Sequence, residues 1–149
     1  MEKELINNPN VMPFAGYLKE TLQLPDTDIK SYSPLTLAYI GDAIYDLIVR
    51  TMIVGNGNAP VNTLHKQASK LVQASAQSES YHKIKDRLTE EEATIFKRGR
   101  NAKSFTSAKN TGIVEYRTAT GLEALMGYLY LTDQMERLLE LIKPEIENR

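Results

Sequence analysis

Apolar side chains recur at helical spacing along most of this 149-residue chain, and this periodicity constrains the fold more than any other feature. Stripes with members three or four residues apart predict long helices over 34–54, from Pro60 to about Lys85, from Thr89 to about Gly99, over 113–131 and beyond Met135. No convincing stretch alternates apolar and polar residues as a strand does. The sequence therefore predicts an all-α fold, a helical bundle.

Start and stop signals support these boundaries. Pro34 suits a first helical position, and a run of Gly and Asn at 55–58 ends that helix. Thr89 with Glu92 three residues later predicts a capping box. A shorter helix is expected from Phe14 to about Leu22. Within 34–54 the residues expected to face the core are Leu37, Ile40, Ile44, Leu47 and Ile48.

Composition excludes several classes of protein. The chain has no cysteine, which rules out a disulfide scaffold, a thiolate zinc site and a cysteine nucleophile. The first ten residues are polar and mixed in charge, unlike a secretory signal. The most apolar stretch contains Asp42, Asp46 and Arg50, which would be costly inside a bilayer. We therefore expect a cytoplasmic protein without a membrane segment.

Two acids stand inside apolar helical stretches. Asp42 follows Gly41 in the 34–54 helix, and Glu123 lies one turn before Gly127 in the 113–131 helix. Interior glycine costs about 1 kcal/mol relative to alanine and often marks close packing of backbones. Two closely packed helices could bring the acids together as oxygen ligands for Mg²⁺ or Mn²⁺. The alternative is that each acid lies at a helix boundary or pairs with Arg or Lys.

Basic charge is concentrated in one window. Residues 97–117 carry a net charge of +5, which leaves −6 for the rest of the chain. Such a patch on an otherwise acidic protein is a candidate polyanion site, although a solvated loop would have the same composition. Much of the window is a long polar segment, Arg100 to Gly112. The candidate residues for binding such a polyanion are Lys97, Arg98, Arg100, Asn101, Lys103, Lys109 and Arg117.

Three motifs, in this order, carry a family resemblance. Residues 37–44 read LAYIGDAI, residues 97–103 read KRGRNAK, and residues 120–125 read TGLEAL after a Tyr-Arg pair at 116–117. The first and last resemble the two acidic helices of the ribonuclease III catalytic domain. Together the three are most similar to its short bacterial group, the Mini-III ribonucleases, over residues 33–147.

This resemblance implies a ribonuclease III endonuclease-domain-like helical bundle at 33–149, preceded by an N-terminal extension at 1–32. It implies a homodimeric endonuclease that cleaves double-stranded RNA and leaves 5′-phosphate ends. Asp42 and Glu123 would be the catalytic residues and the ligands of Mg²⁺, with Mn²⁺ as a substitute. The implied substrate is the precursor of 23S ribosomal RNA, with ribosomal proteins as further candidate partners.

The chain also departs from the wider family. Longer members carry additional acids where this chain has Ala38 and Thr120, so only Asp42 and Glu123 carry over. The number of metal ions, one or two, stays open. One alternative is a non-catalytic RNA-binding protein with the same fold, and another is a helical adaptor with both acids in salt bridges. The roles of Asp46, His65 and Tyr116 are also left open.

Overall fold

The computed structural model describes residues 13–103 and 112–147, and within these ranges it contains helices and no strand. This confirms the all-α prediction. The elements are α2 (Phe14–Thr21), η1 (Ile29–Ser31), α3 (Pro34–Gly55), α4 (Val61–Val72), α5 (Ala74–Ile84), η2 (Lys85–Arg87), α6 (Glu90–Asn101), α7 (Ile113–Leu131) and α8 (Met135–Glu147). No helix in the described part of the chain combines the length and apolar character needed to cross a membrane.

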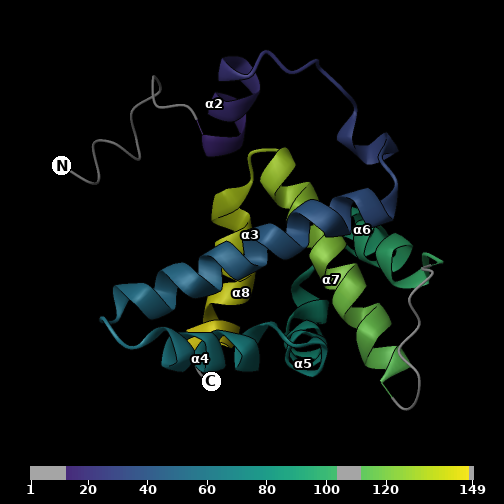
Figure 1. The fold of residues 1–149 in the computed structure, drawn as a ribbon. Coiled ribbons are helices and arrows are strands. Elements are labelled where there is room, and N and C mark those ends of the chain that lie inside the picture. Colours follow the sequence, from purple (N-terminus) through teal and green to yellow (C-terminus); the bar gives the residue numbers. More distant parts are fainter. Residues whose placement is uncertain (1–12, 104–111, 148–149) are drawn as a thin grey trace.

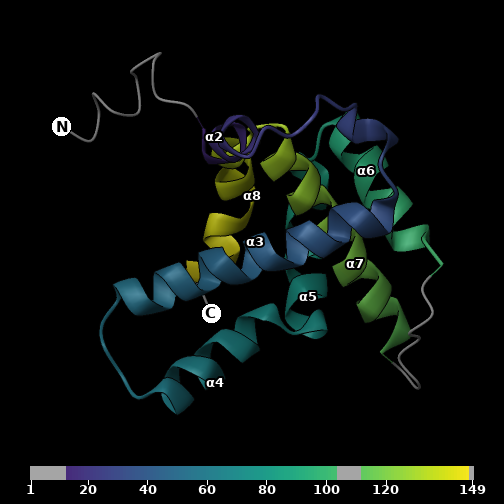
Figure 2. The same ribbon diagram turned by 45° about the horizontal axis from the view of Figure 1, so that its top comes forward.

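Helix α7 is the centre of the bundle. It packs against α3, α5, α6 and α8, and α3 crosses it in both ribbon views (Figures 1 and 2). Nearly every residue from Thr118 to Tyr130 is buried, whichever way its side chain points. A helix that is buried all round reads as apolar on all sides. Glu123 is the one acid in this central stretch, which makes its environment unusual.

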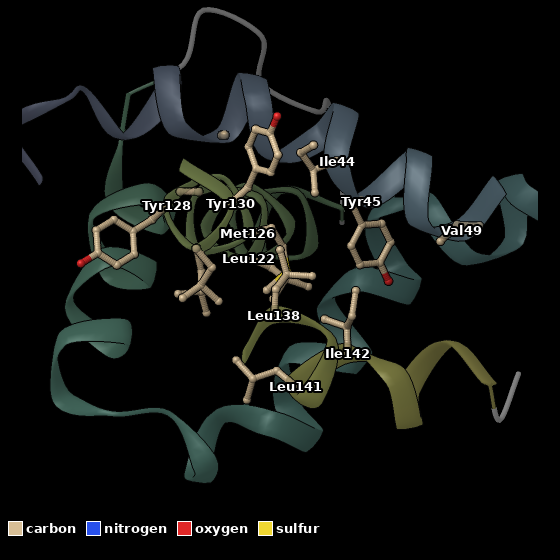
Figure 3. Packing of buried hydrophobic residues seen from close by; sticks show 14 of the residues in the cluster. Ile44, Tyr45, Val49, Leu122, Met126, Tyr128, Tyr130, Leu138, Leu141 and Ile142 are labelled. Atoms are coloured by element: carbon tan, nitrogen blue, oxygen red, sulfur yellow. The ribbon is translucent and has the colours of Figure 1, made fainter. Parts of the chain in front are cut away.

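The apolar core fills the space between α3, α7 and α8. Figure 3 shows Tyr45 and Val49 extending from α3 into this space, and Leu138 and Ile142 entering it from α8. All four side chains are at most 1% exposed. Burial of this kind stabilises the fold by about 25 cal/mol for each Å² of apolar surface removed from water. The core thereby fixes how α3 and α7 cross.

The helix expected from Pro60 to Lys85 is two helices. Gln73 adopts an extended backbone (φ −66°, ψ 155°) that separates α4 from α5. The predicted single helix was therefore wrong at this point. No Gly or Pro stands there to signal a break. The break follows from tertiary packing, because α4 lies against α3 whereas α5 turns to pack against α7.

Two further local predictions need correction. Leu47 is 54% exposed, not buried, and Tyr45 and Val49 occupy the core positions of α3 instead. The polar segment expected to start at Arg100 begins later, because α6 continues to Asn101. By contrast, the Thr89 capping box is present: the backbone N–H of Glu92 donates to the Thr89 hydroxyl, and the backbone N–H of Thr89 donates to the Glu92 carboxylate.

Candidate active site

Helices α3 and α7 touch through their backbones at two glycines. A Cβ atom on Gly41 would lie 1.7 Å from the carbonyl oxygen of Glu123, and one on Gly127 would lie 2.0 Å from that of Leu37. Neither position can hold a side chain without a shift of the backbone. The close approach expected from the two glycines is thus confirmed, and it places Asp42 beside Glu123.

The two carboxyl groups interact directly, and we call them the acid pair. Burial is the largest cause that raises the pKa of Glu123, from 4.5 to about 8, followed by a hydrogen bond and like charge from Asp42. A hydrogen bond from Gln77 opposes this rise. Two carboxylates in close contact cannot both ionise at low cost unless a cation lies between them or nearby. The acid pair therefore has the electrostatics of a cation site.

The donor set fits a hard divalent ion with a hydrated coordination shell. In the described ranges no group of three or more His, Cys, Asp or Glu could hold a metal, so two protein carboxylates are what this site offers. Mg²⁺ accepts such a set because it keeps several water ligands. Thr120, three residues before Glu123, adds no carboxylate, and its hydroxyl donates to the carbonyl of Tyr116.

Other acids and cations near α3 do not join the acid pair. Asp46 forms a 2.9 Å ion pair with Arg50 on the same helix. Among the ion pairs in residues 13–103 and 112–147, none involves Asp42 or Glu123. The adaptor alternative, which needs both acids in salt bridges, therefore finds no support there. His65 and Val54 line an apolar groove, and neither acid of the pair is among the residues that line it.

A second close contact joins α6 to α7. A Cβ atom on Gly99 would lie 2.9 Å from the Cα of Gly121, and one on Gly121 would lie 2.6 Å from the ring of Phe96. Gly121 is two residues before Glu123. The carboxyl end of α6, which carries the basic motif, is therefore anchored to the helix that supplies half of the acid pair.

The predicted RNA-binding residues differ in their surroundings. Lys97, Asn101, Lys103 and Arg117 are exposed. Arg100 is partly exposed, and its guanidinium lies 5.8 Å from the centre of the Phe96 ring, which itself stacks on Tyr81. We use the name basic edge for Lys97, Arg100, Asn101, Lys103 and Arg117.

Two members of the predicted set fall outside this edge. Arg98 donates to the carbonyls of Lys30 and Tyr32 at 3.0 and 3.1 Å, so its guanidinium links α6 to η1. Lys109 lies outside the described residues. Sequence reasoning also missed Gln77, which is 2% exposed on α5. The buried face of α5 could be assigned from the sequence only if the break between α4 and α5 at Gln73 had been predicted.

Comparison with known proteins identifies the fold family. Residues 35–134, from the first turn of α3 to just beyond α7, match the model of the Ribonuclease III domain. A Mini-ribonuclease 3 from Thermoanaerobacter sp. (strain X514) is 49% identical over 89% of this chain and 93% of its own length. The chain belongs to the ribonuclease III family, and within it to the Mini-ribonuclease 3 group. It is accordingly an endoribonuclease.

Two further comparisons agree with this assignment. A Mini-ribonuclease 3 from Clostridium tetani is 52% identical over 78% of each chain. A crystal structure of a protein from Fusobacterium nucleatum superposes with a TM-score of 0.75 at 37% identity, and covers 82% of this chain and 99% of that one. The resemblance drawn from the three motifs is thereby confirmed, and the non-catalytic alternative loses its support.

Proposed function

We propose that this endoribonuclease cleaves double-stranded RNA with Mg²⁺ held by Asp42 and Glu123. The observation that carries the proposal is the direct interaction between these two carboxyl groups, which burial and like charge make unfavourable without a cation. Bound Mg²⁺ would supply a Lewis acid that polarises a phosphate and makes water a better nucleophile, and Mn²⁺ would serve in its place. The products would carry 5′-phosphate and 3′-hydroxyl ends.

The basic edge supports duplex RNA as the substrate. Lys97, Arg100 and Asn101 share one face of α6 by their spacing of three and four residues. Double-stranded RNA is recognised mainly through phosphates and 2′-hydroxyls, which such side chains bind without reading sequence. Arg100 is also steered by its contact with the Phe96 ring. The chain's own role is therefore to bind the duplex with α6 and to hold a cation between α3 and α7.

A cleavage assay tests this proposal. Long duplex RNA is incubated with the protein, with and without Mg²⁺, and the products are separated on a denaturing gel. Asp42→Asn and Glu123→Gln should each lower the rate of Mg²⁺-dependent cleavage by about 100-fold or more. Asp46→Asn is the matched control, because Asp46 is an acid one turn along α3 that is paired with Arg50. Full activity of Asp42→Asn would refute the proposed site.

The proposed natural task is maturation of the ends of 23S ribosomal RNA precursor in the cytoplasm, as the family resemblance implies. Two substrates of equal length separate this task from general duplex cleavage: the terminal stem of that precursor and an unrelated duplex. Preferential cleavage at defined positions of the first supports the proposal. Equal cleavage of both, unchanged when ribosomal proteins are added, would contradict it.

A homodimer is proposed because α3 and α4 expose an apolar strip. Tyr39, Leu47 and Val54 lie along one side of α3, and all are more than half exposed, as is Val61 at the start of α4. Contiguous exposed apolar surface of this kind is typical of protein interfaces, and symmetric pairing covers it on both copies. Asp42 lies at the margin of this strip by its helical position.

Sedimentation equilibrium tests the dimer. The wild-type protein should have twice the chain mass of 16.8 kDa. Leu47→Lys should shift it toward the monomer, whereas Val114→Lys, which alters an exposed apolar residue on α7, should not. A monomeric wild-type protein at high concentration would contradict the proposal.

A further inference from the structure

Gln77 is a buried polar side chain next to the acid pair. It lies on α5, which packs against α7, and it is 2% exposed. A buried amide costs about 1–3 kcal/mol when its polar atoms lack hydrogen-bond partners. A glutamine at such a position needs an explanation, since leucine or methionine would fill a similar space at no such cost.

The nitrogen of the Gln77 amide has partners. Nε2 donates to the carbonyl oxygen of Val72 at 2.8 Å. The amide also hydrogen-bonds the Glu123 carboxyl. The two protons of Nε2 therefore connect the end of α4 to the carboxyl group that lies against Asp42. This arrangement restricts how the Glu123 carboxyl can turn.

The oxygen of the same amide is different. Among the described residues, Oε1 of Gln77 is the buried side-chain atom without a hydrogen-bond partner. Leaving this acceptor unpaired is costly. The fold accepts that cost at a residue whose nitrogen holds the Glu123 carboxyl group, which points to a role for the nitrogen.

We propose that Gln77 is a positioning residue of the metal site: its amide nitrogen, held by the Val72 carbonyl, donates to the Glu123 carboxylate and orients it toward the ion. This inference rests on the proposed function, because it requires the cation at Asp42 and Glu123. Groups that orient metal ligands in this way typically change metal affinity by about 10–100-fold when removed.

Metal binding without RNA provides the test. The protein is titrated with Mn²⁺, and free Mn²⁺ is measured by electron paramagnetic resonance. Gln77→Met keeps the side-chain volume and removes both polar atoms, so the dissociation constant for Mn²⁺ should rise about 10-fold or more. Thr118→Val is the control, because it also removes a buried side-chain hydrogen bond to a backbone carbonyl. Its Mn²⁺ affinity should equal that of the wild type.

Two additional variants separate the outcomes. Asp42→Asn should lose Mn²⁺ binding; if the wild type itself binds no Mn²⁺, both the proposed function and this inference fail. If the wild type binds and Asp42→Asn does not, but Gln77→Met binds as tightly as the wild type, only the role of Gln77 is refuted. Should Gln77→Met fail to fold, Gln77→Asn decides: it keeps the amide but shortens the side chain by one methylene, so Mn²⁺ binding should weaken, and binding as tight as that of the wild type overturns the inference.

Discussion

The acid pair and the basic edge are built in opposite ways. Asp42 and Glu123 are brought together by helices whose backbones touch at Gly41, so their separation is set by the core. Lys97 on α6 and Lys103 just beyond the end of α6 are exposed, so no packing in the core fixes their side chains. The first region holds like charges together against their repulsion, and the second presents like charges to solvent.

This difference separates the two tasks of a nuclease. Chemistry on a phosphate needs ligands held in fixed positions, and a rigid helix crossing supplies that. Binding a regular polyanion needs charge along a surface, and exposed side chains can supply it without being held in one fixed position. Substitutions at the helix crossing should therefore have large effects on folding or activity, and those at the basic edge should have small, graded effects on binding.

The largest effect is expected for Gly41→Ala. Helix propensity alone predicts that this change stabilises the protein by about 1 kcal/mol. The Cβ atom would, however, lie 1.7 Å from the Glu123 carbonyl oxygen, so the two helices must separate. We expect the free energy of unfolding, measured with urea, to fall by about 3 kcal/mol or more.

Gly55→Ala is the matched control, because a Cβ atom there meets nothing within 4 Å. Its stability should be unchanged or rise by up to about 1 kcal/mol. A Gly41→Ala protein as stable as Gly55→Ala would show that the crossing does not fix the acid pair.

The second effect concerns stability and pH in the absence of divalent ions. The pKa of Glu123 rises on folding from 4.5 to about 8, mainly through burial. Between these values the folded protein holds a proton that the unfolded chain has released, so stability falls as pH rises. Glu123→Gln should remove this part of the pH dependence in chemical denaturation. Parallel curves of stability against pH for the wild type and Glu123→Gln would contradict the raised pKa of Glu123.

The smallest effect is expected at the basic edge. In an Asp42→Asn background, which prevents cleavage, binding of duplex RNA is measured across a salt series. Arg100→Ala should reduce the log–log salt slope by about 0.9, because one phosphate contact is lost. Arg98→Ala should leave the slope unchanged and lower stability instead, since its guanidinium donates to two backbone carbonyls. The reverse pattern would require the basic edge to be redefined.

The helix crossing could be predicted from the sequence because the residues that form it are unusual inside helices. Gly41 beside Asp42, and Gly127 after Glu123, are costly inside helices unless they serve contact or chemistry. Gln77 could not be predicted, because its burial depends on a change of direction at Gln73 that no local residue signals. Arg98 shows the complementary failure: charge placed it with the RNA-binding residues, but charge does not reveal the carbonyls of η1.

A double-mutant cycle in the cleavage rate tests most directly whether Asp42 and Glu123 form one site. Single-turnover rates are measured in saturating Mg²⁺ for Asp42→Asn, Glu123→Gln and the double variant. Because a metal ion contributes several kcal/mol to such a reaction, each single change should lower the rate by about 10²–10⁴-fold. If both acids hold the same ion, the double variant should be no slower than the slower single variant. Losses that multiply would mean that the two carboxylates act independently and would contradict the account.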